Sequence, residues 1–425
     1  MPASDNTATT NLLLTLMARY RMRHNSFWSF LQMRTLRNFL ICTCLLFLSC
    51  LLFTYVVYLN SNWIYYYFKL ILPDDEENET VKKNYSPKFY PGKVQSITFD
   101  QRIKYNDFNF LDRSTLNYSS RTYSNGITIL YRLPRLKKPS ALLLIFHGCS
   151  RTALNWFHTE ERQRIVGAAV DLGYGCLAFQ ATDTHSRCWS STGDLFDNDD
   201  VQMVLKGLEE FYKEHGDLAR LPRYTFGASS GGMFSSLFVL NDRYKVSGQI
   251  LFISIIHPQV MFLIRSNNYP PTAFIHMLRD IEFASEERIQ MSTQTFKSQN
   301  IPYKMFPVEP IVVRTSTFHN RIPSIPLEVS NYLYYKLQQN KWLDDDGYMI
   351  HNPRRVKTWQ RFLYETKQKL ILDRLFTFND TLPDFLNTIY GEHEISYERS
   401  FEALKWLKSL NEQPENKVEK QKKKI

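Results

Sequence analysis

The chain has 425 residues, of which 44% are hydrophobic and 15% are aromatic. This length and composition are typical of one large or two ordinary globular domains and exclude an intrinsically disordered protein. The formal net charge is +10, but much of it lies in the arginines of residues 1–37 and the lysines of residues 412–425. The long middle of the chain has no pattern of a nucleic-acid-binding face, so we expect no nucleic-acid partner.

Residues 38–62 have the composition of a transmembrane anchor. No charged residue occurs from Asn38 to Phe68, and the apolar run Phe39–Leu59 is long enough to span a bilayer as one helix. Trp63 and the tyrosines that follow it are typical of an interfacial aromatic belt. A cleaved signal peptide is the competing interpretation, but its apolar core would be shorter and closer to the N-terminus. We therefore expect an uncleaved anchor.

The charges on either side of this anchor predict its orientation. Five arginines precede it, whereas an acidic run, Asp74–Glu77, follows it. The positive-inside rule then leaves residues 1–37 as a cytosolic tail and makes the protein single-pass and type II, with its main body lumenal or extracellular. Four N-x-S/T sequons lie on the predicted lumenal side and agree with this orientation: Asn78, Asn84, Asn117 and Asn379.

The C-terminal residues 411–425 form a basic tail that ends in Lys422-Lys423-Lys424-Ile425. This ending resembles a dilysine retrieval signal, which is read in the cytosol and conflicts with a lumenal C-terminus. We interpret it as a solvated basic tail.

A polar and aromatic stem, residues 63–123, is expected to lead into a folded body at residues 124–410. Continuous apolar runs in this body are typical of strands covered on both faces, and amphipathic segments lie between them. Their alternation predicts a mostly parallel, doubly wound α/β sheet whose ligands bind at the carboxyl ends of its strands. The expected strands are Ile127–Leu133, Ser140–Phe146, Tyr174–Gln180, Val246–Ile256, Thr272–Leu278 and Tyr303–Val308.

The segment Arg223–Leu240 has the pattern of a nucleophile elbow. An aromatic and β-branched run ends in Gly227-Ala228-Ser229-Ser230-Gly231, and a helix-compatible apolar segment follows at once. Gly227 and Gly231 allow the strand and the helix to approach closely at such a turn. The pattern also recurs by chance in loops that contain glycine and serine. We interpret Ser229 as a catalytic nucleophile.

The predicted strand Ser140–Phe146 runs directly into His147-Gly148-Cys149. A serine hydrolase needs a backbone N–H from this loop, paired with the N–H that follows the nucleophile, to form an oxyanion hole. We assign these donors to Cys149 and Ser230 and expect His147 to shape the loop. The alternative is a simple strand-ending turn.

The acid and the histidine of the expected triad must follow the serine in that order. Asp280 ends the predicted strand Thr272–Leu278, and Glu282 is an alternative within reach. His393 lies in a loop before a helical pattern, which is the expected context for the base. His319 lies sooner after the last predicted strand and is the alternative base.

Between the last strand and His393, about residues 310–390, we expect a helical cap insertion that includes helices at Leu327–Gln339 and Lys357–Leu370. An oxidising lumen would permit one disulfide in the body. Cys149 and Cys188 both fall in predicted loops after adjacent strands, so we expect them to pair. Cys176 lies in an apolar strand and is expected to be a buried thiol.

With the elbow, His147-Gly148, Asp280 and His393 in this order, residues 124–410 resemble the α/β-hydrolase superfamily. The long insertion before His393 departs from a minimal member. Three further motifs resemble a little-characterised, membrane-anchored eukaryotic branch: His147-Gly148-Cys149-Ser150, Arg187-Cys188-Trp189-Ser190 and Trp342-Leu343-Asp344-Asp345-Asp346-Gly347. The resemblance implies the α/β-hydrolase fold and serine-hydrolase chemistry, without identifying a substrate.

We therefore expect a membrane-anchored serine hydrolase, a carboxylesterase or lipase-like enzyme that works through an acyl-serine intermediate on a small-molecule or lipid ester. No metal cluster or phosphate-binding loop is evident in the sequence, and this chemistry needs no cofactor. Two alternatives remain at this point. One is an inactive hydrolase-fold binding or adhesion protein, and the other is a serine peptidase.

Overall fold

The computed structural model describes residues 117–124, 126–378 and 381–410. The expected cytosolic tail, the anchor at residues 38–62, Asn78, Asn84, Asn379 and the basic tail 411–425 lie outside the described residues. Asn117 is described and is exposed. No helix among the described residues is both long enough and apolar enough to cross a membrane.

A single eight-stranded, mostly parallel sheet organises the described residues, with the strand order β1-β2-β4-β3-β5-β6-β7-β8. Only β1 and β2 run antiparallel to their neighbours. This is an α/β-hydrolase-like sheet. Because β3, β5 and β7 run parallel, their carboxyl ends lie at the same edge of it. The strands are β1 Ser119–Thr122, β2 Thr128–Arg132, β3 Ala141–Phe146, β4 Tyr174–Phe179, β5 Arg223–Ala228, β6 Val246–Phe252, β7 Thr272–Met277 and β8 Tyr303–Val308.

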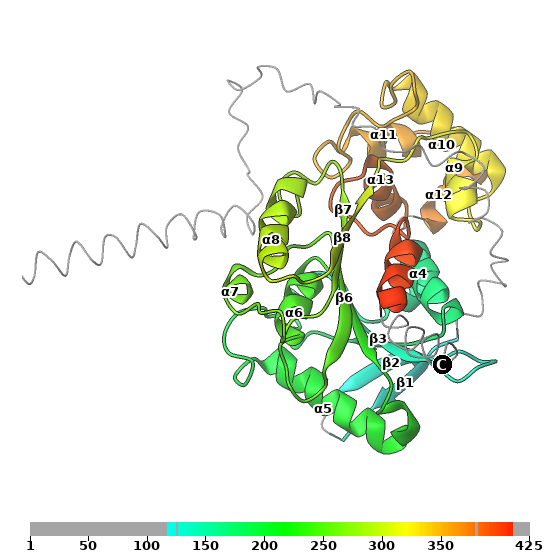
Figure 1. The fold of residues 1–425 in the computed structure, drawn as a ribbon. Coiled ribbons are helices and arrows are strands. Elements are labelled where there is room, and N and C mark those ends of the chain that lie inside the picture. Colours follow the sequence, from blue (N-terminus) through cyan, green and yellow to red (C-terminus); the bar gives the residue numbers. More distant parts are fainter. Residues whose placement is uncertain (1–116, 125, 379–380, 411–425) are drawn as a thin grey trace, which may run out of the picture. The chain divides into compact units, whose positions relative to one another are not determined.

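The sheet is covered by helices on both faces, and each face has its own hydrophobic core (Figure 1). Within β3, Leu142, Leu144 and Phe146 point to one core while the residues between them point to the other, as the two-residue side-chain period of a strand requires. The first face is covered by α5 Asp199–Glu214, α6 Ser230–Phe238 and α8 Glu286–Ser298. The second is covered by α3 Asn155–His158, α4 Glu160–Asp171 and a helix at residues 400–410.

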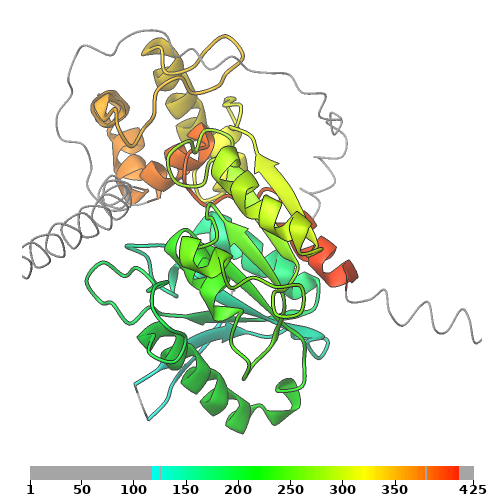
Figure 2. The ribbon, with the colours of Figure 1, turned by 60° about the vertical axis from the view of Figure 1, so that its left-hand side comes forward.

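Helices α9–α13 lie in the segment where a helical cap insertion is expected, and they gather beyond one end of the sheet (Figure 2). We call residues 310–390 the cap. They enclose a third hydrophobic core that is separate from the two cores of the sheet. Their bounds are α9 Thr317–Arg321, α10 Leu327–Gln339, α11 Thr358–Tyr364, α12 Lys369–Thr377 and α13 Leu382–Tyr390. The expected single helix Lys357–Leu370 is wrong, because the chain leaves helical geometry at Glu365 and restarts at Lys369.

Two further elements differ from the sequence expectations. Strand β1 lies within the segment assigned to the stem, so the sheet begins before the expected boundary at residue 124. A short helix, α7 Pro258–Met261, also follows β6.

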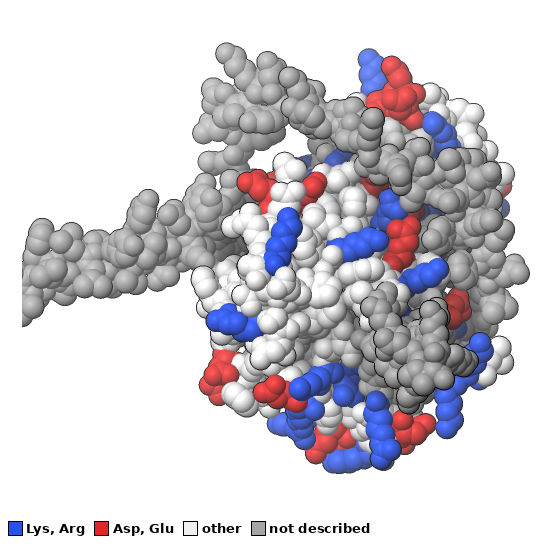
Figure 3. Space-filling view, in the orientation of Figure 1, with Lys and Arg blue, Asp and Glu red and all other residues white. Residues whose placement is uncertain are grey.

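On the face that Figure 3 shows, lysine and arginine side chains are interspersed with aspartate and glutamate.

Candidate active site

Ser229 stands at a sharp turn between β5 and α6. Its backbone has φ 53° and ψ −118°, a region that L-residues rarely adopt. A Cβ added to Gly227 would lie 2.2 Å from the carbonyl oxygen of Gly231, and one added to Gly231 would lie 2.4 Å from that of His147. Only glycine fits at both positions, so the local sequence imposes the elbow geometry.

The structure brings Ser229, His393 and Asp280 into one hydrogen-bonded line. The Ser229 Oγ lies 2.9 Å from His393 Nε2, and His393 Nδ1 lies 2.6 Å from Asp280 Oδ2. Since the carboxylate accepts the Nδ1 proton, Nε2 is left to accept the proton of the serine hydroxyl. This is the arrangement in which a histidine acts as a general base toward a serine.

Asp280 follows β7 and its side chain is fully buried. The backbone N–H groups of Phe283 and Ala284 donate to its Oδ1 at 3.0 and 3.2 Å. Burial alone would raise the pKa of Asp280, but the hydrogen bond and charge of His393, together with these two N–H groups, hold it below its ordinary value. The carboxylate therefore stays ionised and can stabilise an imidazolium beside it.

His393 lies in the loop after α13, which ends at Gly391 with φ 84°. The ring of Phe283 packs against its imidazole with 4.5 Å between ring centroids. The alternative base, His319, lies in α9, and its Nδ1 is 2.7 Å from the carbonyl oxygen of Ile325. The structure therefore brings His393, and not His319, to Ser229.

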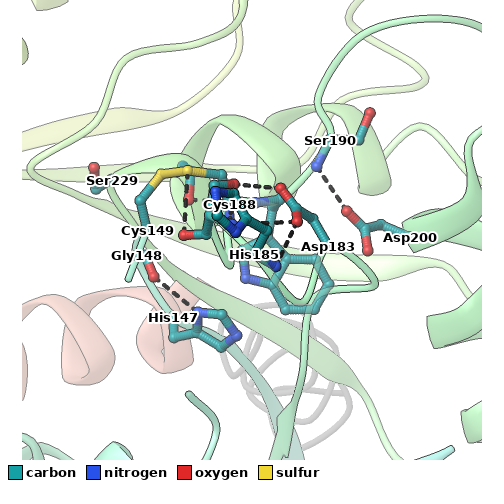
Figure 4. The surroundings of a disulfide bond; sticks show 12 residues. His147, Gly148, Cys149, Asp183, His185, Cys188, Ser190, Asp200 and Ser229 are labelled. Carbon is teal, nitrogen blue, oxygen red and sulfur yellow. Dashed lines mark hydrogen bonds between the residues drawn. A yellow bond between two sulfur atoms is a disulfide. The ribbon is translucent and has the colours of Figure 1, made fainter. Parts of the chain in front are cut away.

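The loop after β3 packs directly against the nucleophile. A Cβ added to Gly148 would lie 3.4 Å from the Cβ of Ser229, and Figure 4 shows Gly148 and Cys149 beside it. Within the described part of the chain, the backbone N–H groups of Cys149 and Ser230 donate to no other residue. Ser230 also begins helix α6, whose positive dipole end favours a developing anion. These two donors are available for an oxyanion.

His147 connects the ends of β3 and β4. Its Nδ1 is 2.8 Å from the carbonyl oxygen of Gly148, and its Nε2 accepts from the Ala181 N–H at 3.2 Å. Burial lowers the pKa of His147 to about 4, although the bond to Gly148 opposes this shift. A neutral imidazole with both nitrogens engaged shapes the loop and transfers no proton.

A disulfide joins Cys149 to Cys188, the pairing that the sequence predicts (Figure 4). It ties the loop after β3 to the loop at residues 180–198. The buried Asp200 holds that second loop by accepting two of its backbone N–H groups at 2.7 and 2.6 Å. Cys176 is a free, buried thiol, and burial raises its pKa to about 12.

Sequence reasoning missed the charged residues around the histidine loop. The side chain of Arg354, from the cap, donates to the carbonyl oxygen of His393 and to the carboxylate of Glu394, both at 2.7 Å. Because 40 residues separate Arg354 from Glu394, no local pattern identifies the pair. In the part of the chain that the structure describes, no group of three or more His, Cys, Asp or Glu side chains is placed to hold a metal ion.

No protein-family model matches the chain, and no curated protein matches it in sequence. Solved hydrolases resemble its fold at low identity. The propionate-bound esterase Est2 of the Planctomycetes species Thermogutta terrifontis is 15% identical over 45% of this chain and 82% of its own, with a TM-score of 0.35. The S-formylglutathione hydrolase of Agrobacterium tumefaciens is 14% identical over 45% and 86%, with a TM-score of 0.36. A serine hydrolase homologue from Coxiella burnetii is 14% identical over 51% and 96%, with a TM-score of 0.35. At these values, none of them assigns an activity to this chain.

Proposed function

We propose that this protein is a serine hydrolase that cleaves carboxylic esters through an acyl intermediate on Ser229. The observation that carries the proposal is the pair of hydrogen bonds from Ser229 through His393 to Asp280, at 2.9 and 2.6 Å. A serine hydroxyl is a weak nucleophile until an adjacent base takes its proton. Here His393 is in hydrogen-bond contact with Ser229, and the buried carboxylate of Asp280 fixes the tautomer of the imidazole.

In the acylation step, Ser229 Oγ attacks the ester carbonyl carbon while its proton passes to His393 Nε2. The carbonyl oxygen becomes an oxyanion, which the N–H groups of Cys149 and Ser230 stabilise. The imidazolium of His393 is held by the ionised Asp280. When the tetrahedral intermediate collapses, the bond to the leaving alcohol breaks and His393 gives that alcohol its proton.

Deacylation repeats these steps with water as the nucleophile. His393 takes a proton from water, the hydroxide attacks the acyl carbon, and a second tetrahedral intermediate forms in the same oxyanion hole. Its collapse releases the carboxylic acid and returns the proton to Ser229 Oγ. The free enzyme is regenerated without a cofactor.

Labelling of the full-length protein in membranes with a fluorophosphonate probe tests the proposal. We expect wild type and His319→Ala to be labelled, because His319 is engaged with a backbone carbonyl in the cap. Ser229→Ala and His393→Ala should not be labelled. A folded wild-type protein that does not react would instead support a non-catalytic binding or adhesion protein with this fold.

Ester chemistry is separated from peptidase chemistry by matched substrates. We expect p-nitrophenyl esters to be hydrolysed faster than p-nitroanilides with the same acyl group. Faster cleavage of the anilide, or cleavage of peptides alone, would replace the esterase proposal with a serine peptidase on the same triad.

We also propose that residues 38–62 anchor the protein in a membrane and that the hydrolase body lies in the lumen or outside the cell. The charge pattern of the sequence supports this orientation. A disulfide in the body is typical of an oxidising compartment, and the Asn117 sequon is exposed. Peptide N-glycosidase should increase the electrophoretic mobility of the wild type, and Asn117→Gln should reduce that shift. A body that protease digests in intact microsomes would contradict the orientation.

A further inference from the structure

One segment of the cap contacts both the loop that carries Asp280 and the loop that carries His393. We call residues 349–355 the bridging segment. At one end Arg279, the residue before Asp280, donates to the carbonyl oxygen of Met349 at 2.6 Å. At the other end Arg354 donates to the carbonyl oxygen of His393 at 2.7 Å. The bridging segment therefore contacts the neighbours of both residues that must align behind Ser229.

The same segment contacts the residues on either side of His393. Asn352 donates to the Glu392 carboxylate, and Arg355 pairs with Glu392 and also with Glu282, in the loop of Asp280. One short stretch of the cap thus contacts two loops that are more than 100 residues apart in the chain.

Glu394 is the buried centre of this arrangement. Its carboxylate pairs with Arg354 at 2.7 Å, with Arg162 of α4 at 3.4 Å and with Arg151 at 3.7 Å. Burial would raise the pKa of Glu394, but these arginines and the N–H of Ile395 lower it below its ordinary value. The residue next to His393 is therefore anchored to both the sheet domain and the cap.

His393 itself needs external support. Its φ of 41° is unusual for a residue with a side chain, and such a backbone persists only where the surroundings over-determine it. We propose that Arg354 is a positioning residue that holds His393 in line between Ser229 and Asp280. The cap insertion is then part of the scaffold of the active site and not only a cover over substrate. This inference rests on the proposed function.

The test compares Arg354→Gln and Arg354→Lys in the full-length protein. Arg361→Gln is the matched control, because Arg361 lies in the same cap but its side chain is 83% exposed and pairs with Glu365, four positions along the chain. Two quantities are measured: kcat and KM for p-nitrophenyl butyrate, and the rate constant for fluorophosphonate labelling of Ser229. The downfield Nδ1 proton resonance of His393 in ¹⁵N-histidine-labelled protein reports alignment independently of turnover.

We expect Arg354→Gln to lower kcat and the labelling rate by about 10- to 100-fold with KM within about twofold, since small misplacements of catalytic groups have effects of this size. Its Nδ1 resonance should shift or broaden. Arg354→Lys, which keeps the charge and can donate to both oxygens, should recover most of the loss. If wild type is not labelled but the resonance still responds to Arg354→Gln alone, the proposed hydrolase function falls and the positioning role stands. If Arg354→Gln matches Arg361→Gln in labelling rate and resonance, the positioning role is overturned.

Discussion

The carboxylate of Asp280 and the imidazole of His393 are joined by a 2.6 Å hydrogen bond across 113 positions of sequence. This bond fixes the proton on Nδ1 and leaves Nε2 free to act on Ser229. Asp280→Asn would place an amide there, which favours the wrong tautomer. We expect kcat to fall by about 10³- to 10⁴-fold with little change in KM, measured by steady-state ester hydrolysis.

Glu282→Gln is the control for that experiment. Glu282 lies two residues away and is the alternative acid that the sequence suggests, but its carboxylate is half-exposed and pairs with Arg355. Its replacement should change kcat by less than about threefold, because an exposed ion pair contributes little. Equal losses in the two variants would show that Asp280 is not the orienting acid.

The elbow glycines are predicted to tolerate no side chain. In Gly227→Ala the new Cβ would lie 2.2 Å from a backbone oxygen that cannot move without shifting α6. We expect the free energy of unfolding to fall by about 3 kcal/mol or more, measured by chemical denaturation. Gly167→Ala, in α4 with open space around it, should instead be neutral or raise that free energy by about 0.5–1 kcal/mol. Similar effects at both positions would contradict the crowding argument.

Much of the sheet was predictable because its strands are buried on both faces. The run Ala141–Phe146 is fully buried and uniformly apolar, so composition alone identifies it as a strand. Strand β1 carries no such signal, since all four of its residues are exposed and backbone pairing with β2 holds it. The break between α11 and α12 at residues 365–368 was also not predictable, because apolar residues at helical spacing continue on both sides of it.

Motif order predicts Ser229 at the elbow and Asp280 at the end of an apolar strand, and it favours His393 over His319 only through the helical pattern that follows His393. The ion pairs around the triad could not be predicted from the sequence. Arg162, Arg151 and Arg354 converge on Glu394 from positions 40 to 243 residues away, and only the folded chain places them together. Long-range ion pairs have no periodicity, so a single sequence cannot reveal them.

The disulfide is expected to act on both stability and catalysis. It closes a loop of 39 residues, and the chain-entropy model gives a stabilisation of about 3–4 kcal/mol. The double variant Cys149→Ala/Cys188→Ala should lose about that free energy of unfolding. Its kcat should fall by about 10-fold. The loop after β3 loosens without the disulfide, but the backbone N–H of residue 149, the proposed oxyanion donor, is still present.

Reduction of the wild type provides the matched comparison for that double variant. Dithiothreitol should lower the free energy of unfolding and kcat of the wild type and leave the double variant unchanged, since its disulfide has been removed and Cys176 is already a free thiol. If dithiothreitol lowers stability and kcat equally in both proteins, the effect does not come from the Cys149–Cys188 disulfide.

His147 is expected to make the fold sensitive to mild acid. Its folded-state pKa is about 4, whereas an unfolded histidine titrates near 6.5. As the pH falls from about 6.5 to about 4, the unfolded chain takes up a proton that the buried imidazole does not, so the free energy of unfolding falls by about 3 kcal/mol. In His147→Asn, the amide can still donate to the Gly148 carbonyl but cannot titrate. Denaturant unfolding followed by tryptophan fluorescence across this range should show a shallower acid slope for the variant than for the wild type. Identical slopes would mean that His147 is protonated within the fold, and that the loop beside Ser229 carries a positive charge.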